Sequence, residues 1–295
     1  MTVAIGLSDG EKGLACMVAS GILLTGQDAV VKWLTDDYTT GEIMFWRALL
    51  SFLPMAFLIW QAGGPGLLRS RRPVALMTRA LLAAGTSLMI VLSFRYLALA
   101  DALAIVFLSP ILLTALAAPL LGEYVGPRRW AAVAVGFAGM LLMVRPGGEA
   151  VGIAVLAPLA AATLSAVRDI ITRHLGPTDH ALSILFYSTV FSTLIGVFDM
   201  PRGLTPPALA DLALFLAIAL MWGLAHLLGI MALAYAEASA ISPFKYLSLV
   251  WAALLGYLVW GHVPDLWLTA GAVLVVASGL YILQRERLPG GRRRR

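Results

Sequence analysis

The sequence ALADALAI at residues 98–105 returns as AYAEASAI at residues 234–241. Four alanines keep their register, and one acidic residue, Asp101 or Glu237, stands at the same place in each copy. Further matches follow in the same order along the chain: LGEYV at 121–125 faces WGHV at 260–263, and FAGML at 137–141 faces ASGLY at 277–281. These matches indicate that the second half of the chain repeats the first.

The composition shows which solvent surrounds this repeat. Of the 295 residues, 60% are hydrophobic and only 13% are charged, with a mean hydropathy of +0.89. Soluble proteins carry about 25% charged residues, because their surface must be polar. The composition therefore excludes a soluble enzyme, a nucleic-acid-binding module and a disordered protein. A single cysteine excludes a disulfide framework.

Ten apolar runs are long enough to cross a bilayer, whose core of about 30 Å needs roughly 20 helical residues. The runs cover residues 13–34, 41–62, 73–97, 101–121, 128–145, 152–174, 182–199, 208–233, 237–260 and 266–284. Asp101 is the only break between the third and fourth runs, and Glu237 the only one between the eighth and ninth, so we expect a tight hairpin at each. None of the runs alternates as a transmembrane barrel strand does. The sequence predicts an all-α polytopic membrane protein with ten transmembrane helices, because helices satisfy their backbone groups internally in lipid.

The repeat divides these helices into two halves, residues 1–146 and 147–295. Five spans is an odd number, so the second half enters the membrane in the opposite sense to the first. Such inverted repeats exchange conformations around a site near the middle of the membrane, which gives alternating access. The pattern therefore favours a transporter.

Lys and Arg residues indicate the orientation, because they accumulate in cytoplasmic loops. With the N-terminus in the cytoplasm, inner segments hold 13 of them and outer loops hold two. The inner residues are Lys12, Arg69, Arg71, Arg72, Arg128, Arg129, Arg173, Arg285, Arg287 and Arg292 to Arg295, and the outer ones are Arg145 and Arg202. We expect both termini in the cytoplasm, with the terminal arginines bound to lipid headgroups rather than to nucleic acid.

Several segments resemble the drug/metabolite transporter superfamily, EamA type. They run from Arg95 to Glu123 and from Ser242 to His262, together with Phe45-Trp46-Arg47, and the likeness extends over residues 13–284. The resemblance implies ten helices in two inverted repeats, a bacterial-type inner membrane, and export of amino acids or related metabolites. His262 departs from the pattern, since the family usually has Glu there.

Lys245 is the deepest cation, because it lies eight residues, or ~12 Å, beyond Glu237. We interpret it as facing a central cavity where it attracts a substrate carboxylate; the alternatives are that it snorkels towards the membrane surface or pairs with an acid of the protein. Two Ser-Pro pairs, Ser109-Pro110 and Ser242-Pro243, lie at similar depths in the two halves. Each proline interrupts a helix, so they mark a substrate-binding region or a packing kink.

Other side chains are candidates for the same region. Five residues are candidates for an aromatic wall around the substrate: Tyr96, Trp222, His226, Tyr246 and Trp251. The alternative for the Trp and Tyr residues is a place in the interfacial aromatic belt, and helix packing is favoured for His226. Two acid-first pairs, Asp28 with Lys32 and Asp169 with Arg173, are spaced for ion pairs within one helix. They are candidate gates or proton-coupling sites, with structural anchoring as the alternative. For Arg47, Arg79, Arg95 and Arg168 we expect snorkelling towards the nearer membrane surface.

No enzyme motif and no nucleotide-binding motif occurs in the sequence. We therefore expect a secondary transporter without cofactor or metal, whose partners are a small molecule, lipid and, if transport is coupled, protons. The leading hypothesis is export of amino acids, aromatic or other neutral ones, and related metabolites. The alternative cargoes are drugs, cationic dyes, nucleosides or a sulfonium cofactor. A channel or an intramembrane enzyme fits less well, and the oligomeric state stays open.

Overall fold

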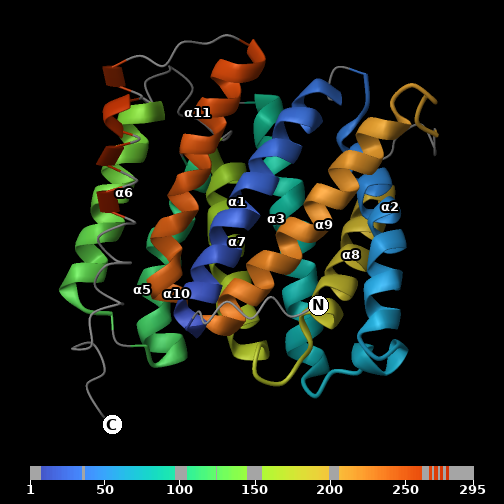
Figure 1. The fold of residues 1–295 in the computed structure, drawn as a ribbon, viewed down its shortest axis with the longest axis horizontal. Coiled ribbons are helices and arrows are strands. Elements are labelled where there is room, and N and C mark those ends of the chain that lie inside the picture. The colour runs from blue at the N-terminus through green and yellow to red at the C-terminus, as the bar shows by residue number, and fades with distance from the viewer. Residues whose placement is uncertain are drawn as a thin grey trace.

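A computed structural model describes residues 8–34, 37–96, 105–123, 125–144, 155–198 and 206–260, with short stretches at 266–267, 269–271, 273–274 and 277–278. Every element in these ranges is a helix (Figure 1). The elements are α1 Asp9–Leu34, α2 Thr40–Gln61, η1 Pro65–Leu68, α3 Pro73–Tyr96, α5 Ser109–Leu121, α6 Pro127–Val144, α7 Leu156–Leu175, α8 Ala181–Phe198, α9 Leu212–Tyr235, α10 Ala238–Ile241, η3 Ser242–Tyr246 and α11 Leu247–Trp260. Within the described part of the chain, α1, α2, α3, α8 and α9 contain stretches long and apolar enough to cross a membrane.

Local sequence signals set several helix ends. Thr39 caps α2, because its hydroxyl accepts from the Glu42 amide while the Glu42 carboxylate accepts from the Thr39 amide. Gly122 ends α5 in the left-handed conformation at φ 67°, which costs least for glycine. These caps hold the helices at fixed lengths, so the depth of each side chain along its helix is set locally.

The helices pack as two interchangeable sets. α1 packs along α9, and α7 packs along α3 in the same way. α2 contacts α8 and α9, while α8 contacts α2 and α3, and the pairs α5 with α7 and α11 with α1 complete the correspondence. Exchanging α1–α2–α3–α5 for α7–α8–α9–α11 therefore keeps these main contacts. The predicted fold class, an all-α membrane protein of two inverted repeats, is confirmed.

Small residues allow the close helix contacts. A Cβ on Gly13 of α1 would lie 2.7 Å from the Ala236 Cβ, and one on Gly196 of α8 would lie 2.8 Å from the Phe45 backbone nitrogen. No side chain fits at either contact without a shift of the helices. In lipid, where apolar side chains gain little by leaving the solvent, such close backbone approach drives helix association.

The break predicted between the eighth and ninth apolar runs is present. α9 ends at Tyr235, Ala236 is extended at φ −130° and ψ 160°, and α10 begins at Ala238. This confirms the tight hairpin expected at Glu237. The helix then tightens into the 3-10 segment η3 at Ser242-Pro243 before α11. In the first half, α5 begins at Ser109-Pro110 after a turn, so both Ser-Pro pairs interrupt a helix as predicted.

Two ends of the bundle differ in their contacts. At the end where α1 begins, which we call the N-terminal face, the Gly13–Ala236 contact is flanked by ion pairs of Arg173 with Glu123 at 3.7 Å and of Arg129 with Glu237 at 2.5 Å. At the opposite face, the Tyr38 hydroxyl donates to Asp211 at 2.8 Å and accepts from the Ala208 amide at 3.0 Å. The two halves are therefore joined by ion pairs at the N-terminal face and by hydrogen bonds at the opposite face.

Some predictions fall outside the described residues. The boundary at 146/147, the hairpin at Asp101, Arg145, Arg202, His262 and the arginines at the C-terminus are among them. The tenth apolar run, at 266–284, is described only in short helical stretches. The count of ten helices and the exact domain limits therefore stay predictions. The cations Lys12, Arg72, Arg129 and Arg173 all make contacts at the N-terminal face, as the expected orientation requires.

Candidate functional site

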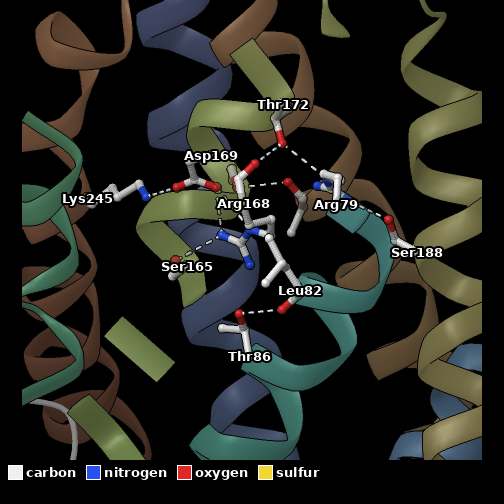
Figure 2. A network of polar contacts seen from close by, with 11 residues as sticks. Arg79, Leu82, Thr86, Ser165, Arg168, Asp169, Thr172, Ser188 and Lys245 are labelled. Carbon is white, nitrogen blue, oxygen red and sulfur yellow. Dashed lines mark hydrogen bonds and ion pairs between the residues drawn. The ribbon is translucent and has the colours of Figure 1, made fainter. Parts of the chain in front are cut away.

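A buried carboxylate, Asp169 of α7, lies at the centre of a polar network inside the bundle (Figure 2). Its Oδ1 accepts from Arg168 Nε at 3.0 Å and Nη2 at 2.9 Å, while its Oδ2 forms an ion pair with the Lys245 ammonium of η3. Arg168 also donates to the Ser165 hydroxyl at 3.1 Å. Both oxygens of Asp169 are therefore occupied by cations of the protein.

A third cation lies in the same network. Arg79 of α3 is 3% exposed, and it donates to the Thr172 hydroxyl of α7 at 3.0 Å and to the Ser188 hydroxyl of α8. Figure 2 shows Arg79 reaching the network from the side opposite Lys245. We call Arg79, Ser165, Arg168, Asp169, Thr172, Ser188 and Lys245 the Asp169 cluster. Three cations surround one carboxylate there, so its net charge is positive.

A second network lies around Asp28 of α1. The Gln27 side chain links two groups: its amide nitrogen donates to Asp28 Oδ1, and its oxygen accepts from Arg47 Nη1 of α2 at 3.1 Å. Arg47 also donates through Nη2 to the Ser87 hydroxyl of α3 at 3.2 Å. Arg47 and Gln27 are buried, and Arg47 Nε has no partner. The guanidinium is thus held firmly at an interior position.

Two aromatic rings of α9 complete this second network. The Arg47 guanidinium lies 5.1 Å from the Trp222 ring, a cation–π contact. The His226 ring packs on Trp222 with centroids 4.5 Å apart, and His226 Nδ1 lies 2.9 Å from the Trp222 carbonyl oxygen. We call Gln27, Asp28, Arg47, Ser87, Trp222 and His226 the Asp28 cluster. It combines charge, hydrogen-bonding groups and a ring surface.

Asp28 is accessible from inside the bundle. On α1, Ala15, Ile22 and Trp33 are exposed, and their spacings of 7 and 11 residues place them on one helix face, which we assign to lipid. Asp28 lies 11 residues after Met17, which is buried in the core, so these two side chains share the inward face. Asp28 is nevertheless exposed. Solvent therefore reaches this carboxylate from the interior of the bundle.

The two clusters occupy equivalent places in the repeat. Asp28 and Asp169 each stand six residues before the end of α1 or α7, and Arg47 and Ser188 each stand seven residues after the start of α2 or α8. The clusters differ at the broken helices. Two residues after the Ser-Pro proline, the second half has Lys245 and the first half has Leu112. Asp28 consequently has no lysine equivalent to the one that neutralises Asp169.

Comparison with known proteins identifies the fold and the class of function. The model of the EamA-like transporter family matches the chain twice, at residues 11–145 and 150–284. The chain belongs to the EamA-like transporter family. The two matches fall in the two halves that the internal repeat indicates. The family and the apolar helices together show that this transporter is an integral membrane protein.

Relatives extend over nearly the whole length of this EamA-like transporter. A riboflavin transporter of Rhizobium johnstonii is 32% identical over 289 residues, covering 97% of this chain and 95% of the relative. An S-adenosylmethionine uptake transporter of Rickettsia bellii is 25% identical over 276 residues (93% and 94%), and a pseudopaline exporter of Pseudomonas aeruginosa is 26% identical over 270 residues (91% and 94%). These names support a transport role, with a small-molecule substrate, rather than catalysis.

A solved crystal structure shares the fold. It superposes with a TM-score of 0.79 at 17% sequence identity, and the match covers 95% of this chain and 99% of the other. At this identity the likeness concerns the fold alone.

The structure corrects one predicted ion pair. Asp169 was expected to pair with Arg173 one helical turn away, and this is wrong: Asp169 pairs with Arg168 and Lys245 instead. Arg173 reaches the N-terminal face, where it contacts Glu123 and donates to the Leu233 and Ala234 carbonyls. The adjacent Arg168 of the same helix and Lys245 of η3 replace the partner one turn away, because Asp169 faces the bundle. The other expected pair includes the Lys32 side chain, which lies outside the described residues.

The expectation of snorkelling arginines is also wrong at two positions. Arg47 and Arg79 are 5% and 3% exposed, and each is hydrogen-bonded to residues of other helices. The missed signal is the helical face: Arg47 lies on the buried stripe of α2 with Met44 and Ser51. Burial of a cation is tolerated only when its donors find partners, and neighbouring helices supply hydroxyl and amide acceptors here.

The remaining predicted residues are dispersed. Tyr246 is fully buried, and a Cβ on Gly136 of α6 would lie 2.8 Å from its ring. Trp251 lies beside Gly21 of α1, and its indole nitrogen has no partner. Ser109 and Pro110 are buried in the first turn of α5. The side chains of Tyr96, Ser242 and Pro243 lie outside the described residues.

The structure thus places five of the predicted residues in the two interior clusters: Lys245, Trp222, His226, Asp28 and Asp169. Lys245 lies inside the bundle, and its partner is the protein's own Asp169. Trp222 and His226 join the Asp28 cluster from the other half of the chain. This contact between α9 and the Asp28 cluster was not predictable from the sequence, because α1 and α9 meet only through tertiary packing.

Proposed function

We propose that this protein is a secondary transporter for a planar heteroaromatic metabolite of the riboflavin class, and that it works by alternating access. The observation that carries the proposal is the Asp28 cluster. There an accessible carboxylate stands beside a held guanidinium and a stacked Trp222–His226 pair. The likeness to the riboflavin transporter of Rhizobium johnstonii supports the same class of cargo.

The chemistry of this cargo suits the cluster. Riboflavin and S-adenosylmethionine, the cargoes named for two relatives, each carry a planar fused ring with nitrogen and a hydroxyl-bearing sugar-derived group, an open ribityl chain in the first and a cyclic ribose in the second. A planar ring stacks on an aromatic side chain at a favourable offset of about 4.5–7 Å between centroids. The polar edge of the ring needs fixed hydrogen-bonding partners, and Asp28 with its neighbours provides them. Trp251 of α11 is a further candidate contact, because its indole nitrogen is unpaired.

The contacts at the bundle ends support one access state for this structure. At the N-terminal face, the Gly13–Ala236 contact and the ion pairs of Arg173 and Arg129 close the path. Asp28 is exposed in the interior, near the opposite face. With the N-terminus in the cytoplasm of a bacterial cell, this is an outward-open state. In the inward-open state the N-terminal contacts separate, and Asp169 and Lys245 come closer to the cytoplasm.

The driving force comes from gradients. The chain carries no nucleotide-binding motif, so ATP does not power the step. The concentration gradient of the cargo, or of coupled protons, then sets the direction, and export follows when the cargo is more concentrated inside. Asp28 is the candidate proton acceptor, because it is the cluster carboxylate that solvent reaches.

Counterflow in proteoliposomes tests the proposal. Vesicles preloaded with unlabelled riboflavin are expected to accumulate external labelled riboflavin, and vesicles containing the Asp28→Asn variant are expected to accumulate at least ~10-fold less. The Asp9→Asn variant is the matched control, because Asp9 is exposed at the other end of the same helix. Repetition with a pH gradient tests proton coupling. Absence of riboflavin counterflow in the unaltered protein contradicts the proposal.

Export of amino acids is the second candidate, and the Asp169 cluster favours it. A zwitterion is able to replace the internal ion pair, with its ammonium on Asp169 and its carboxylate on Lys245 and Arg168. The same vesicles loaded with neutral and aromatic amino acids test this candidate. Amino-acid counterflow without flavin counterflow would replace the first proposal by the second.

A further inference from the structure

The Asp28 carboxylate keeps an acceptor oxygen open in the Asp28 cluster. Among the described residues, the hydrogen bond to the carboxylate comes from Gln27 and reaches Oδ1. Asp28 Oδ2 therefore keeps its capacity to accept. Arg47 donates from Nη1 to Gln27 and from Nη2 to Ser87, and its Nε has no partner. The cluster thus offers an open carboxylate oxygen beside a guanidinium that neighbouring helices hold in place.

His226 adds a second acceptor. Its Nδ1 lies 2.9 Å from the Trp222 carbonyl oxygen, and a carbonyl oxygen only accepts. Nδ1 therefore carries the hydrogen, and in the neutral ring Nε2 is left with a lone pair. The ring that stacks on Trp222 thus presents an acceptor edge.

Gln27 fixes the direction of the open carboxylate. Because its oxygen accepts from Arg47 and its nitrogen donates to Asp28, the orientation of the amide is determined by both neighbours. Arg47 is itself held over Trp222. This chain from Arg47 through Gln27 to Asp28 is preformed, so a bound ligand meets a carboxylate already placed on the inward face of α1.

We infer that Asp28 selects the cargo by accepting a hydrogen bond from a ring N–H group, either an imide N–H or an exocyclic amino group, while the ring lies against His226, which itself packs on the buried Trp222. The inference rests on the proposed function and deepens it. Gln27 is a positioning residue, since it acts through Asp28. A ligand whose edge offers only acceptors leaves Asp28 without its hydrogen bond, and a charged group left unpaired on burial costs much of the affinity.

A methylated ligand tests this on the unaltered protein. Riboflavin carries one imide N–H, at ring position N3, and 3-methylriboflavin replaces that hydrogen by a methyl group. We expect the purified protein in nanodiscs to bind riboflavin roughly 10- to 100-fold more tightly than 3-methylriboflavin, which is the range for a hydrogen bond to a charged group. Quenching of flavin fluorescence measures both dissociation constants.

The variants locate the effect. Asp28→Asn is expected to weaken riboflavin binding about 10-fold and to reduce discrimination against the methylated ligand to less than ~3-fold. Gln27→Ala is expected to reduce the discrimination in part. Asp9→Asn, at the far end of α1, is expected to keep the discrimination of the unaltered protein. Size-exclusion chromatography confirms that each variant is folded.

The outcomes separate the inference from the proposed function. If the unaltered protein binds both flavins equally, or if Asp28→Asn keeps the full discrimination, the role of Asp28 is overturned while flavin transport stands. If the unaltered protein binds neither flavin, the proposed cargo is overturned and the inference falls with it. The methylated ligand decides the matter even if Asp28→Asn fails to fold.

Discussion

The Asp28 cluster and the Asp169 cluster occupy matching positions in the two halves, yet their carboxylates meet opposite environments. Asp169 is buried and holds Arg168 and Lys245, whereas Asp28 is exposed on the inward face and holds one neutral amide. A duplicated carboxylate has thus become an internal counter-ion in one half and an open acceptor in the other. An inverted repeat therefore preserves the arrangement of the helices but not the chemistry at equivalent positions of the two halves.

The difference arises at two positions: Arg168 precedes Asp169 whereas Gln27 precedes Asp28, and Lys245 has no lysine counterpart in the first half. Lys245 stands two residues after Pro243, and Leu112 stands two residues after Pro110. A lysine at this point supplies a cation to the facing carboxylate, and a leucine does not. We therefore expect loss of the Asp169 carboxylate to damage folding and loss of the Asp28 carboxylate to damage transport.

The largest effect on stability is expected for Asp169→Asn. This change leaves Arg79, Arg168 and Lys245 without a counter-charge, and breaking a buried ion pair in this way costs about 3–5 kcal/mol. Thermal unfolding of the purified protein measures it. Asp28→Asn is the matched control and is expected to change stability by less than about 1 kcal/mol. Equal losses in the free energy of unfolding for both variants would contradict a structural role that only Asp169 has.

The next effect is expected for Lys245→Met. Asp169 keeps its bonds to Arg168, so the loss is that of one charge-assisted hydrogen bond, about 1.5–3 kcal/mol. The double variant Asp169→Asn with Lys245→Met is expected to be less destabilised than the sum of the single variants, because each removes the partner of the other. Strict additivity in thermal unfolding would contradict the pairing.

Closure of the N-terminal face is tested by Gly13→Leu. The new side chain meets Ala236 and separates α1 from α9, at a cost of about 1–3 kcal/mol for overpacking. A cysteine introduced at Ala234, which lies against Gly176, is then expected to react faster with a membrane-impermeant maleimide from that face. Gly66→Leu is the control, since nothing lies within 4 Å of a Cβ there. An unchanged reaction rate would mean that Gly13 does not hold the closed face together.

The smallest effect is expected for Glu237→Gln. The Arg129–Glu237 pair is substantially exposed, with side chains 24% and 47% accessible, so the loss in stability is about 0–1 kcal/mol and falls further at high salt. Glu123→Gln is the matched comparison, because the Glu123 side chain is 7% accessible and also accepts from the Ala238 amide at 3.0 Å. Thermal unfolding at two salt concentrations distinguishes them. A larger loss for Glu237→Gln would reverse the assignment of the stronger contact.

Much of the fold was predictable because its signals are local or periodic. The apolar runs, the Ser-Pro interruptions and the hairpin at Glu237 were each predicted near the positions where the structure has them. The interior position of Lys245 was predictable too, because a charged side chain within an apolar run usually faces a cavity or a partner. Its partner was not, because the carboxylate that it meets is 76 residues away along the chain.

Composition, periodicity and repetition in the sequence indicate that the chain lies in lipid, that it is helical and that it is duplicated. They also give the position of each charged residue along its apolar run. Composition sets the solvent, and the hydrogen-bonded backbone sets the rise per residue, so these properties need no knowledge of the neighbours. Only the tertiary structure decided which way each side chain points and what it touches: Arg47 over Trp222, Lys245 on Asp169, and Asp28 open to the interior. The reason is that helices from opposite halves meet through long-range packing. The rotation of each helix about its axis sets whether a charged side chain contacts a residue of another helix or stays open to a ligand.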